Sequence, residues 1–197
     1  MFHFLTRWKL SRLLKVVKRY QTIRENGNNK SVPLEIKALW VLADYYKNKL
    51  LTNAKFPLAR LYLFEYLRAA ASLNDKNAQY QCGLMRFEEA KFYAAWCLSS
   101  YRRAIHEKLR TEAFDEAFAF LEVAIKNKHS DALRYKGLAY INGWGVDKDT
   151  NVGFDYILDS IAMENAWAKA TKIIEKLNLN SPEFFKALTQ YQHKNVT

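Results

Sequence analysis

Histidine, the commonest metal ligand and a frequent acid–base catalyst, is thinly scattered through this sequence. The four histidines are His3, His106, His129 and His193. No two of them stand at the spacing of metal ligands on one helix, and His106-Glu107 is not followed by a second histidine four residues after the first. The histidines therefore predict no metal centre.

Two other patterns resemble catalytic motifs only superficially. Glu88 and Glu89 are neighbours on a predicted helix, so their carboxylates project about 100° apart and form no poised acid–base pair. The run Gly143-Trp144-Gly145-Val146 lacks the Gly-Lys-Ser/Thr of a phosphate-binding loop, and no strand precedes it. We therefore expect a protein that is not an enzyme and that needs no cofactor or metal.

The two cysteines, Cys82 and Cys97, lie in apolar helical contexts and are too few for a disulfide framework. We expect both to be buried free thiols, as in a reducing compartment. The sequence holds no run of eighteen apolar residues and no secretory signal. A cytoplasmic protein is expected, with peripheral association at the inner membrane as the alternative.

The residues with the composition of a binding site fall in two groups. The first lies within residues 87–110, which no Gly or Pro interrupts, so extra helical turns are expected there. Aromatic and arginine side chains are enriched at interface hot spots. The candidates for partner binding are therefore Trp96, Tyr101, Arg102, Arg103 and Arg110. The alternative is a lengthened helix pair that packs on its neighbours.

The second group lies in the first thirty residues, which are strongly basic. Eight of the 31 basic residues fall there against one acidic residue, Glu25, so the segment carries a net charge of +7. Its pattern predicts an amphipathic helix over residues 2–20. The apolar positions on one side are Phe2, Leu5, Trp8, Leu13, Val16, Val17 and Tyr20. A turn is expected at Asn26-Gly27-Asn28-Asn29.

Two interpretations of this basic helix stay open, and both can hold. As a cap, it covers the apolar face of the first helix pair, which the terminal unit of a repeat array requires. As a docking element, it binds an anionic membrane or an acidic protein. The docking candidates are Trp8, Arg12, Lys15, Lys18 and Arg19. Nucleic acid is the least favoured partner, because no DNA- or RNA-binding motif is recognisable.

The composition favours helices as the elements that position these residues. At 197 residues, the chain has the length of one domain. Half of its residues are hydrophobic and 15% are aromatic, which excludes disorder over most of the chain. Only six glycines and three prolines occur, and no stretch shows the alternation of a strand.

Small residues recur at a helix-pair period. Ala38, Ala78, Ala132 and Ala166 start similar patterns, separated by 40, 54 and 34 residues. A second small residue follows five positions later at Ala43, Gly83 and Gly137. In the second helix of each unit, Leu63, Ala117 and Gly153 share one position, and Ala70, Ala124 and Ser160 share another. Repeats of this length indicate a solenoid, in which each helix pair needs a neighbour.

The best-defined unit runs from Ala132 to Asp149. It reads Ala-x4-Gly-x2-Tyr-x2-Gly-x-Gly-Val-x-Lys-Asp, with Gly143 and Gly145 as structural turn residues on either side of Trp144. This pattern resembles the Sel-one-like repeat, a relative of the tetratricopeptide repeat. The resemblance covers roughly residues 35–170, and the earlier units depart from it, since Asn74 stands where a glycine is common.

The resemblance and the pattern together predict an all-α fold, an α-solenoid of antiparallel helix pairs in a single domain. Residues 1–32 form the basic helix and turn, and residues 33–180 form three repeats, the second with a helical insertion near 88–113. The pairs are expected over residues 35–70, 77–127 and 131–164. Residues 181–197 form a capping helix that begins at Ser181-Pro182-Glu183. The cap covers the last repeat with Phe184, Phe185, Leu188 and Tyr191.

The resemblance implies protein binding rather than catalysis, because such repeats mostly serve as adaptors. We expect an adaptor or scaffold within a larger bacterial assembly, such as a secretion-system accessory. The alternatives are a peripheral membrane tether that uses the basic helix, and an immunity or inhibitor protein that binds a toxin.

Overall fold

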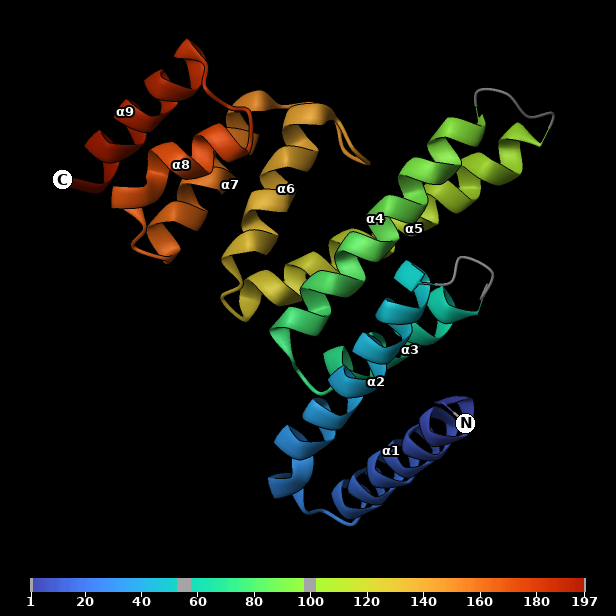
Figure 1. Ribbon diagram of the computed structural model, residues 1–197. Coiled ribbons are helices and arrows are strands. Elements are labelled where there is room, and N and C mark those ends of the chain that lie inside the picture. Colours follow the sequence, from blue (N-terminus) through green and yellow to red (C-terminus); the bar gives the residue numbers. More distant parts are fainter. Residues whose placement is uncertain (1, 53–57, 98–101, 197) are drawn as a thin grey trace. The chain divides into compact units, whose positions relative to one another are not determined.

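A computed structural model of the protein describes residues 2–52, 58–97 and 102–196, with side chains from residue 9 to residue 193 in those ranges. The regular structure in these ranges is helical, which confirms the predicted all-α fold of helices that pack against their sequence neighbours (Figure 1). The helices are α1 (Phe2–Glu25), α2 (Val32–Thr52), α3 (Ala59–Ser72), α4 (Lys76–Cys97), α5 (Arg103–Lys126), α6 (Ser130–Asn142), α7 (Thr150–Met163), α8 (Ala170–Lys176) and α9 (Pro182–Val196). Two 3-10 turns are η1 (Asn29–Ser31) and η2 (Trp167–Lys169).

The chain divides into two compact units, residues 1–82 and residues 83–197. In the first unit, α2 and α3 form an antiparallel pair, and α1 packs against α2 (Figure 1). Leu39 and Leu42 of α2 and Leu63 and Leu67 of α3 are buried between the helices of this unit. The buried ring of Tyr46 lies with its centre 4.9 Å from that of Tyr62 in α3.

In the second unit, α5 runs antiparallel to the part of α4 that follows residue 82. A Cβ placed on Gly83 would lie 2.9 Å from Leu121, near the end of α5. The ring of Phe87 lies 5.1 Å from that of Phe118, three residues before Leu121 on α5. Phe87 is fully buried, because Tyr135 of α6 packs on it as well, at 5.1 Å between ring centres.

Helices α6 and α7 pack through two glycines that face each other. A Cβ on Gly137 would lie 2.6 Å from the carbonyl oxygen of Gly153, and a Cβ on Gly153 would lie 2.7 Å from that of Gly137. Backbone oxygens cannot move aside as a flexible side chain can. The repeat positions occupied by these glycines therefore have a packing reason, since only glycine allows the helices to approach this closely.

The second helix of each pair ends in the same hydrogen-bonded turn. Asn74, Lys128 and Asn165 follow α3, α5 and α7 with positive φ values of 67°, 59° and 50°. The next amide donates to the carbonyl five residues earlier: Asp75 to Ala70, His129 to Ala124, and Ala166 to Ile161. This geometry is the Schellman motif, and its recurrence repeats the helix-pair pattern in the backbone.

The small residues predicted to mark the repeats lie inside the packed units. Ala38, Ala43, Ala70, Ala78, Gly83, Ala117, Ala124, Ala132, Gly137, Gly153 and Ser160 are all buried. The three predicted pairs correspond to α2–α3, α4–α5 and α6–α7. The pattern at Ala166 starts no fourth pair of that kind, because it leads into η2 and the short helix α8.

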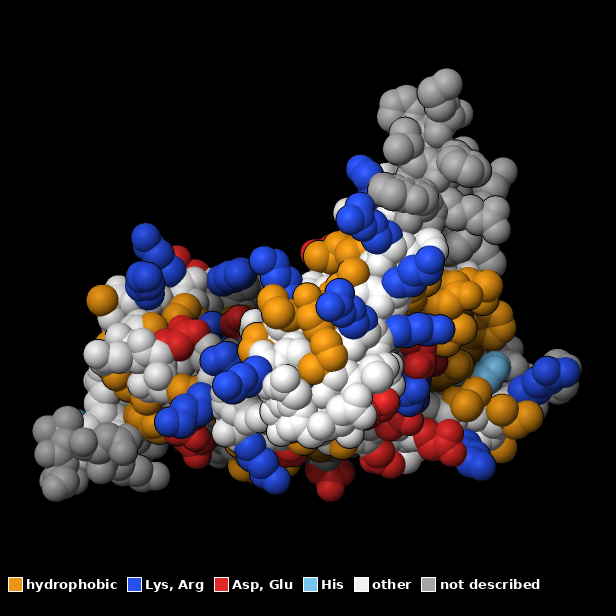
Figure 2. Space-filling model, turned by 90° about the horizontal axis from the view of Figure 1, so that it is seen from below, with side chains coloured by type: hydrophobic (Ala, Val, Ile, Leu, Met, Phe, Trp, Pro, Cys, Tyr) orange, Lys and Arg blue, Asp and Glu red, His pale blue; other side chains and the backbone are white. Residues whose placement is uncertain are grey.

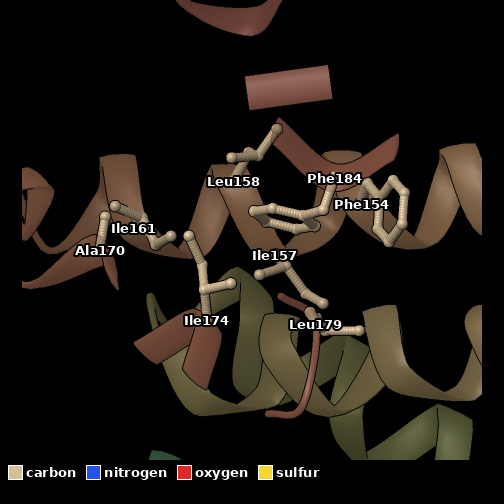
Figure 3. Packing of buried hydrophobic residues seen from close by; sticks show 8 residues of the cluster. All are labelled: Phe154, Ile157, Leu158, Ile161, Ala170, Ile174, Leu179 and Phe184. Atoms are coloured by element: carbon tan, nitrogen blue, oxygen red, sulfur yellow. The ribbon is translucent and has the colours of Figure 1, made fainter. Parts of the chain in front are cut away.

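The C-terminal helix α9 begins where the sequence predicts. Pro182 is its first residue, and the amide of Phe184 donates to the Ser181 hydroxyl over 3.3 Å, so Ser181 caps the helix. Figure 3 shows Phe184 beside Phe154 and Ile157 of α7, in a cluster that α8 also joins through Ile174. Helix α9 therefore covers the apolar side of α7.

For one residue of this cap, Phe185, the prediction is wrong. Phe184 is fully buried, and Leu188 and Tyr191 pack against the same cluster, but Phe185 is 42% exposed. Adjacent residues on a helix point about 100° apart. Once Phe184 enters the cluster, Phe185 is therefore turned toward solvent.

Candidate functional site

The predicted insertion lengthens α4 and α5. Residues 88–97 form the C-terminal part of α4, and residues 102–113 include the start of α5 at Arg103. We call these two stretches the α4–α5 arm. Of the predicted partner-binding residues, the arm contains Trp96, Arg102, Arg103 and Arg110, whereas Tyr101 lies outside the described residues.

Aromatic side chains gather along one edge of the arm. Trp96 lies between Phe92 and His106, at 5.6 and 5.8 Å between ring centres, and Tyr93 stacks on His106 at 6.3 Å. We call Phe92, Tyr93, Trp96 and His106 the aromatic patch. Phe92 and Trp96 are 57% and 51% exposed. Large apolar side chains this exposed and in mutual contact are typical of a binding surface.

The predicted arginines of the arm have different surroundings. Arg102 and Arg103 are exposed, and Arg103 forms an ion pair with Glu107 at 2.9 Å, four residues later on α5. This hydrogen bond to Glu107 raises the pKa of Arg103. Arg110 is half-buried and lines a pocket. The structure therefore separates Arg110 from the two arginines near the end of the arm.

The pocket has a volume of about 680 Å³ and lies between the arm and the turn that joins α6 to α7. Its lining combines two cationic, two acidic, and several apolar or aromatic side chains with the glycine turn. These residues are Lys91, Ala94, Arg110, Thr111, Phe114, Asp115, Gly143, Trp144, Gly145, Val146 and Asp147. The structure thus brings together two features that are separate in the sequence, the insertion and the Gly-Trp-Gly turn.

The glycines of this turn are required by its geometry, as the sequence predicts. Gly143 and Gly145 have φ values of 70° and 71°. Gly143 ends α6 in the left-handed conformation, and the amide of Trp144 donates to the Ala139 carbonyl over 2.9 Å. A Cβ on Gly145 would lie 2.5 Å from the Phe114 side chain. The missing Cβ therefore lets the turn reach α5 and close one side of the pocket.

Lys91 of α4 holds Trp144 in place from across the pocket. Its ammonium lies 3.7 Å from the centre of the indole ring, a close cation–π contact. The same ammonium donates to the Tyr135 hydroxyl over 3.2 Å and pairs with Glu88 at 3.4 Å. Burial, together with the nearby Glu88 carboxylate, raises the pKa of Tyr135 to about 12. Tyr135 therefore stays protonated at neutral pH and supports the position of Lys91.

The docking candidates of α1 occupy its solvent side. Arg12, Lys15, Lys18 and Arg19 are exposed. Lys and Arg side chains line the described part of α1, which runs toward the top of Figure 2. The remaining candidate, Trp8, belongs to α1, but its side chain lies outside the described residues.

The polar groups that the sequence analysis set aside have structural contacts. His129 caps α6, since its Nδ1 accepts a hydrogen bond from the Ala132 amide at 3.3 Å. Cys82 and Cys97 are buried free thiols, as predicted, and burial raises the pKa of Cys82 to about 12. Among the described residues, no three His, Cys, Asp or Glu side chains are grouped as metal ligands.

Most residues of the pocket lining were not predicted from the sequence. Lys91, Phe114 and Trp144 were not among the predicted site residues, although Trp144 drew attention by standing between two glycines. No sequence signal links Lys91 to Trp144, because their contact depends on how α4 packs beside the α6–α7 turn.

Within the described part of the chain, no helix has the length and apolar character needed to cross a bilayer.

Comparison with known protein families and curated proteins identifies no relative. A scan of the chain against models of protein families gives no match, and a search of the curated proteins gives no similar sequence.

Proposed function

We propose that this protein is a non-catalytic adaptor or scaffold that binds a protein partner through the α4–α5 arm. We also propose that its helix pairs are Sel-one-like repeats, with the arm as the feature that distinguishes this chain from a regular array. The observation that carries the proposal is the exposure of Phe92 and Trp96, which touch each other on the surface of the arm.

Burial of these two rings by a partner gives a favourable free energy of association. Full burial of a large apolar side chain contributes about 1.5–3 kcal/mol relative to exposure. Trp is also among the residues most often found to dominate interfaces. Ring contacts within the aromatic patch hold Trp96 against Phe92 and His106, so little side-chain entropy is lost when a partner binds.

The pocket supports the same function with polar groups on the same arm as the aromatic patch. Arg110 and Asp115 line it from α5, and Asp147 lines it from the α6–α7 turn. Guanidinium and carboxylate groups in one pocket suit a peptide segment, which carries both acceptors and donors. A partner that covers the patch and extends into the pocket would contact the arm on two sides.

Capture of partners from the natural host tests this proposal. The tagged chain is expressed at its native level, and co-eluting proteins are identified by mass spectrometry. We expect the double variant Phe92→Ala/Trp96→Ala to lose at least one partner that the wild type retains. A hot-spot loss of about 2 kcal/mol or more corresponds to roughly a 30-fold weaker complex.

A matched control uses two apolar side chains of similar exposure elsewhere in the second unit. Met163 and Phe185 are 41% and 42% exposed, so Met163→Ala/Phe185→Ala removes comparable surface away from the arm. This control should keep every partner. If the patch variant keeps them all as well, or if both variants lose the same partners, the arm is not the binding surface.

A further inference from the structure

The net charge of the protein is concentrated in its first compact unit. Residues 1–82 contain 15 Lys and Arg against 5 Asp and Glu, a net charge of +10. Residues 83–197 contain 16 against 15, a net charge of +1. The total of +11 therefore belongs almost entirely to the unit that includes α1.

Four cations of α1 form one strip along the helix. At about 100° per residue, Arg12, Lys15, Lys18 and Arg19 fall within a sector of about 120°. All four are exposed. A helix rises about 1.5 Å per residue, so the strip is about 10 Å long between residues 12 and 19. Four positive charges in so small an area produce a strong local potential.

The apolar side of α1 is already occupied within the same unit. Leu13, Val17 and Tyr20 are half-buried, and α1 packs against α2. Arg24, near the end of α1, donates to the carboxylate of Glu35 in α2 over 3.1 Å, and Glu35 is buried. In the described part of α1, these contacts hold the apolar side chains within the unit and leave the basic strip exposed.

We propose that the basic strip binds the surface of an anionic phospholipid bilayer, with α1 lying along the headgroups while it stays packed on α2. Each lysine or arginine near such a surface strengthens binding by about fivefold. Four together give a factor on the order of several hundred. The attraction of the strip is electrostatic, because the half-buried Leu13, Val17 and Tyr20 of the described part of α1 are not free to enter the acyl region.

The surroundings of the strip favour a bilayer over an acidic protein. A protein interface has an apolar core surrounded by polar groups. Among the described side chains of α1, from residue 9 onward, no large hydrophobic side chain is exposed. A strip of exposed cations with no exposed large apolar side chain among the described residues of α1 suits a planar array of anionic headgroups, because the cations alone can contact the headgroups.

Vesicle co-sedimentation of the full-length protein tests the proposal. The wild type should pellet with phosphatidylcholine vesicles that contain phosphatidylserine, and it should stay in solution with phosphatidylcholine alone. Binding should weaken as salt is added, because the Debye length falls from about 30 Å at 0.01 M to about 8 Å at 0.15 M ionic strength.

Two charge-reversal variants locate the binding surface. The strip variant is Arg12→Glu/Lys15→Glu/Lys18→Glu/Arg19→Glu. The control is Lys148→Glu/Lys169→Glu/Lys172→Glu/Lys186→Glu, which reverses four exposed lysines of the second unit and changes the net charge equally. Circular dichroism establishes that each variant is folded. We expect the strip variant to lose vesicle binding by a factor of about 100 or more, while the control keeps most of it.

A milder variant with glutamine at the same four α1 positions replaces the strip variant if the reversal prevents folding, and it too should lose vesicle binding. The proposal is wrong if the wild type does not bind vesicles that contain phosphatidylserine, even if it binds polyglutamate or duplex DNA. Equal losses in the strip variant and the control would also overturn it. The Phe92→Ala/Trp96→Ala variant should still bind vesicles, which separates this surface from the protein-binding arm.

Discussion

Gly145 lies at a position where another residue faces both backbone strain and a steric clash. Gly145 has a φ of 71° and Gly143 has a nearly equal φ of 70°, but the surroundings of the two glycines differ. An added Cβ at Gly145 would lie 2.5 Å from Phe114, whereas at Gly143 the nearest atom is 3.4 Å away, in Lys148. Substitution of Gly143 therefore measures the backbone strain alone, whereas substitution of Gly145 measures the strain and the steric clash together.

We expect Gly143→Ala to lower the free energy of unfolding by about 1–2 kcal/mol, the cost of a left-handed non-glycine residue. Gly145→Ala should cost more, about 2–5 kcal/mol, because overpacking against Phe114 adds to that strain. Urea unfolding of both variants measures the difference. Equal losses would show that Phe114 moves aside without cost.

At the scale of an element, α9 stabilises the second unit through one side of the helix. Phe184 is fully buried, with its ring centre 4.8 Å from that of Phe154, while Phe185 is 42% exposed. We expect Phe184→Ala to destabilise the protein by about 3–5 kcal/mol. Phe185→Ala should cost under about 1 kcal/mol, because most of that ring already contacts water.

Thermal unfolding of these neighbouring variants tests the capping role of α9. Deletion of residues 181–197 should lower the melting temperature at least as much as Phe184→Ala, since it also removes the hydrogen bond from the Tyr191 hydroxyl to Asp159, at 2.7 Å. If the deletion left the melting curve unchanged, α9 would not be a cap. A large loss in Phe185→Ala would mean that its ring has a partner in solution.

At the scale of the whole molecule, cysteine and tyrosine side chains whose pKa is raised by burial predict a loss of stability at alkaline pH. Burial raises the pKa of Cys82 from 9.0 and of Tyr46 from 10.0, in each case to about 12, and the pKa of Tyr135 is raised similarly. Above about pH 9, the unfolded chain loses these protons while the folded protein keeps them. The free energy of unfolding therefore falls as pH rises from about 9 toward 12.

Urea unfolding at about pH 8 and about pH 11 measures this dependence. The variant Cys82→Ala serves as the control. It should lose less stability between the two pH values than the wild type, because one of the ionising groups is gone. Lys136 adds a change of the same sign, since hydrogen bonds to Glu122 and Tyr156 outweigh its burial and raise its pKa. A flat profile for the wild type would contradict the assignment of buried, protonated groups.

Much of the architecture is determined by short stretches of sequence. The turn at Gly143 and Gly145 and the cap at Ser181-Pro182 are local, because φ angles and helix-end hydrogen bonds depend on residues a few positions apart. The small residues at Ala78, Ala117 and Gly137 mark helix contacts for a similar reason. A buried helix face recurs with the helical period, so it is visible in the spacing of residue types.

The sites depend on contacts that no local pattern encodes. Lys91 meets Trp144 only because α4 and the α6–α7 turn pack on opposite sides of one pocket, and these residues are far apart in the chain. Phe184 and Phe185 have equal hydrophobicity, and the position of α7 decides which one is buried. Likewise, packing on α2 decides that α1 presents charge to solvent. The sequence alone determined the helices and their ends, because those interactions span one or two turns; tertiary structure decided which side chains meet, because burial is a property of several helices together.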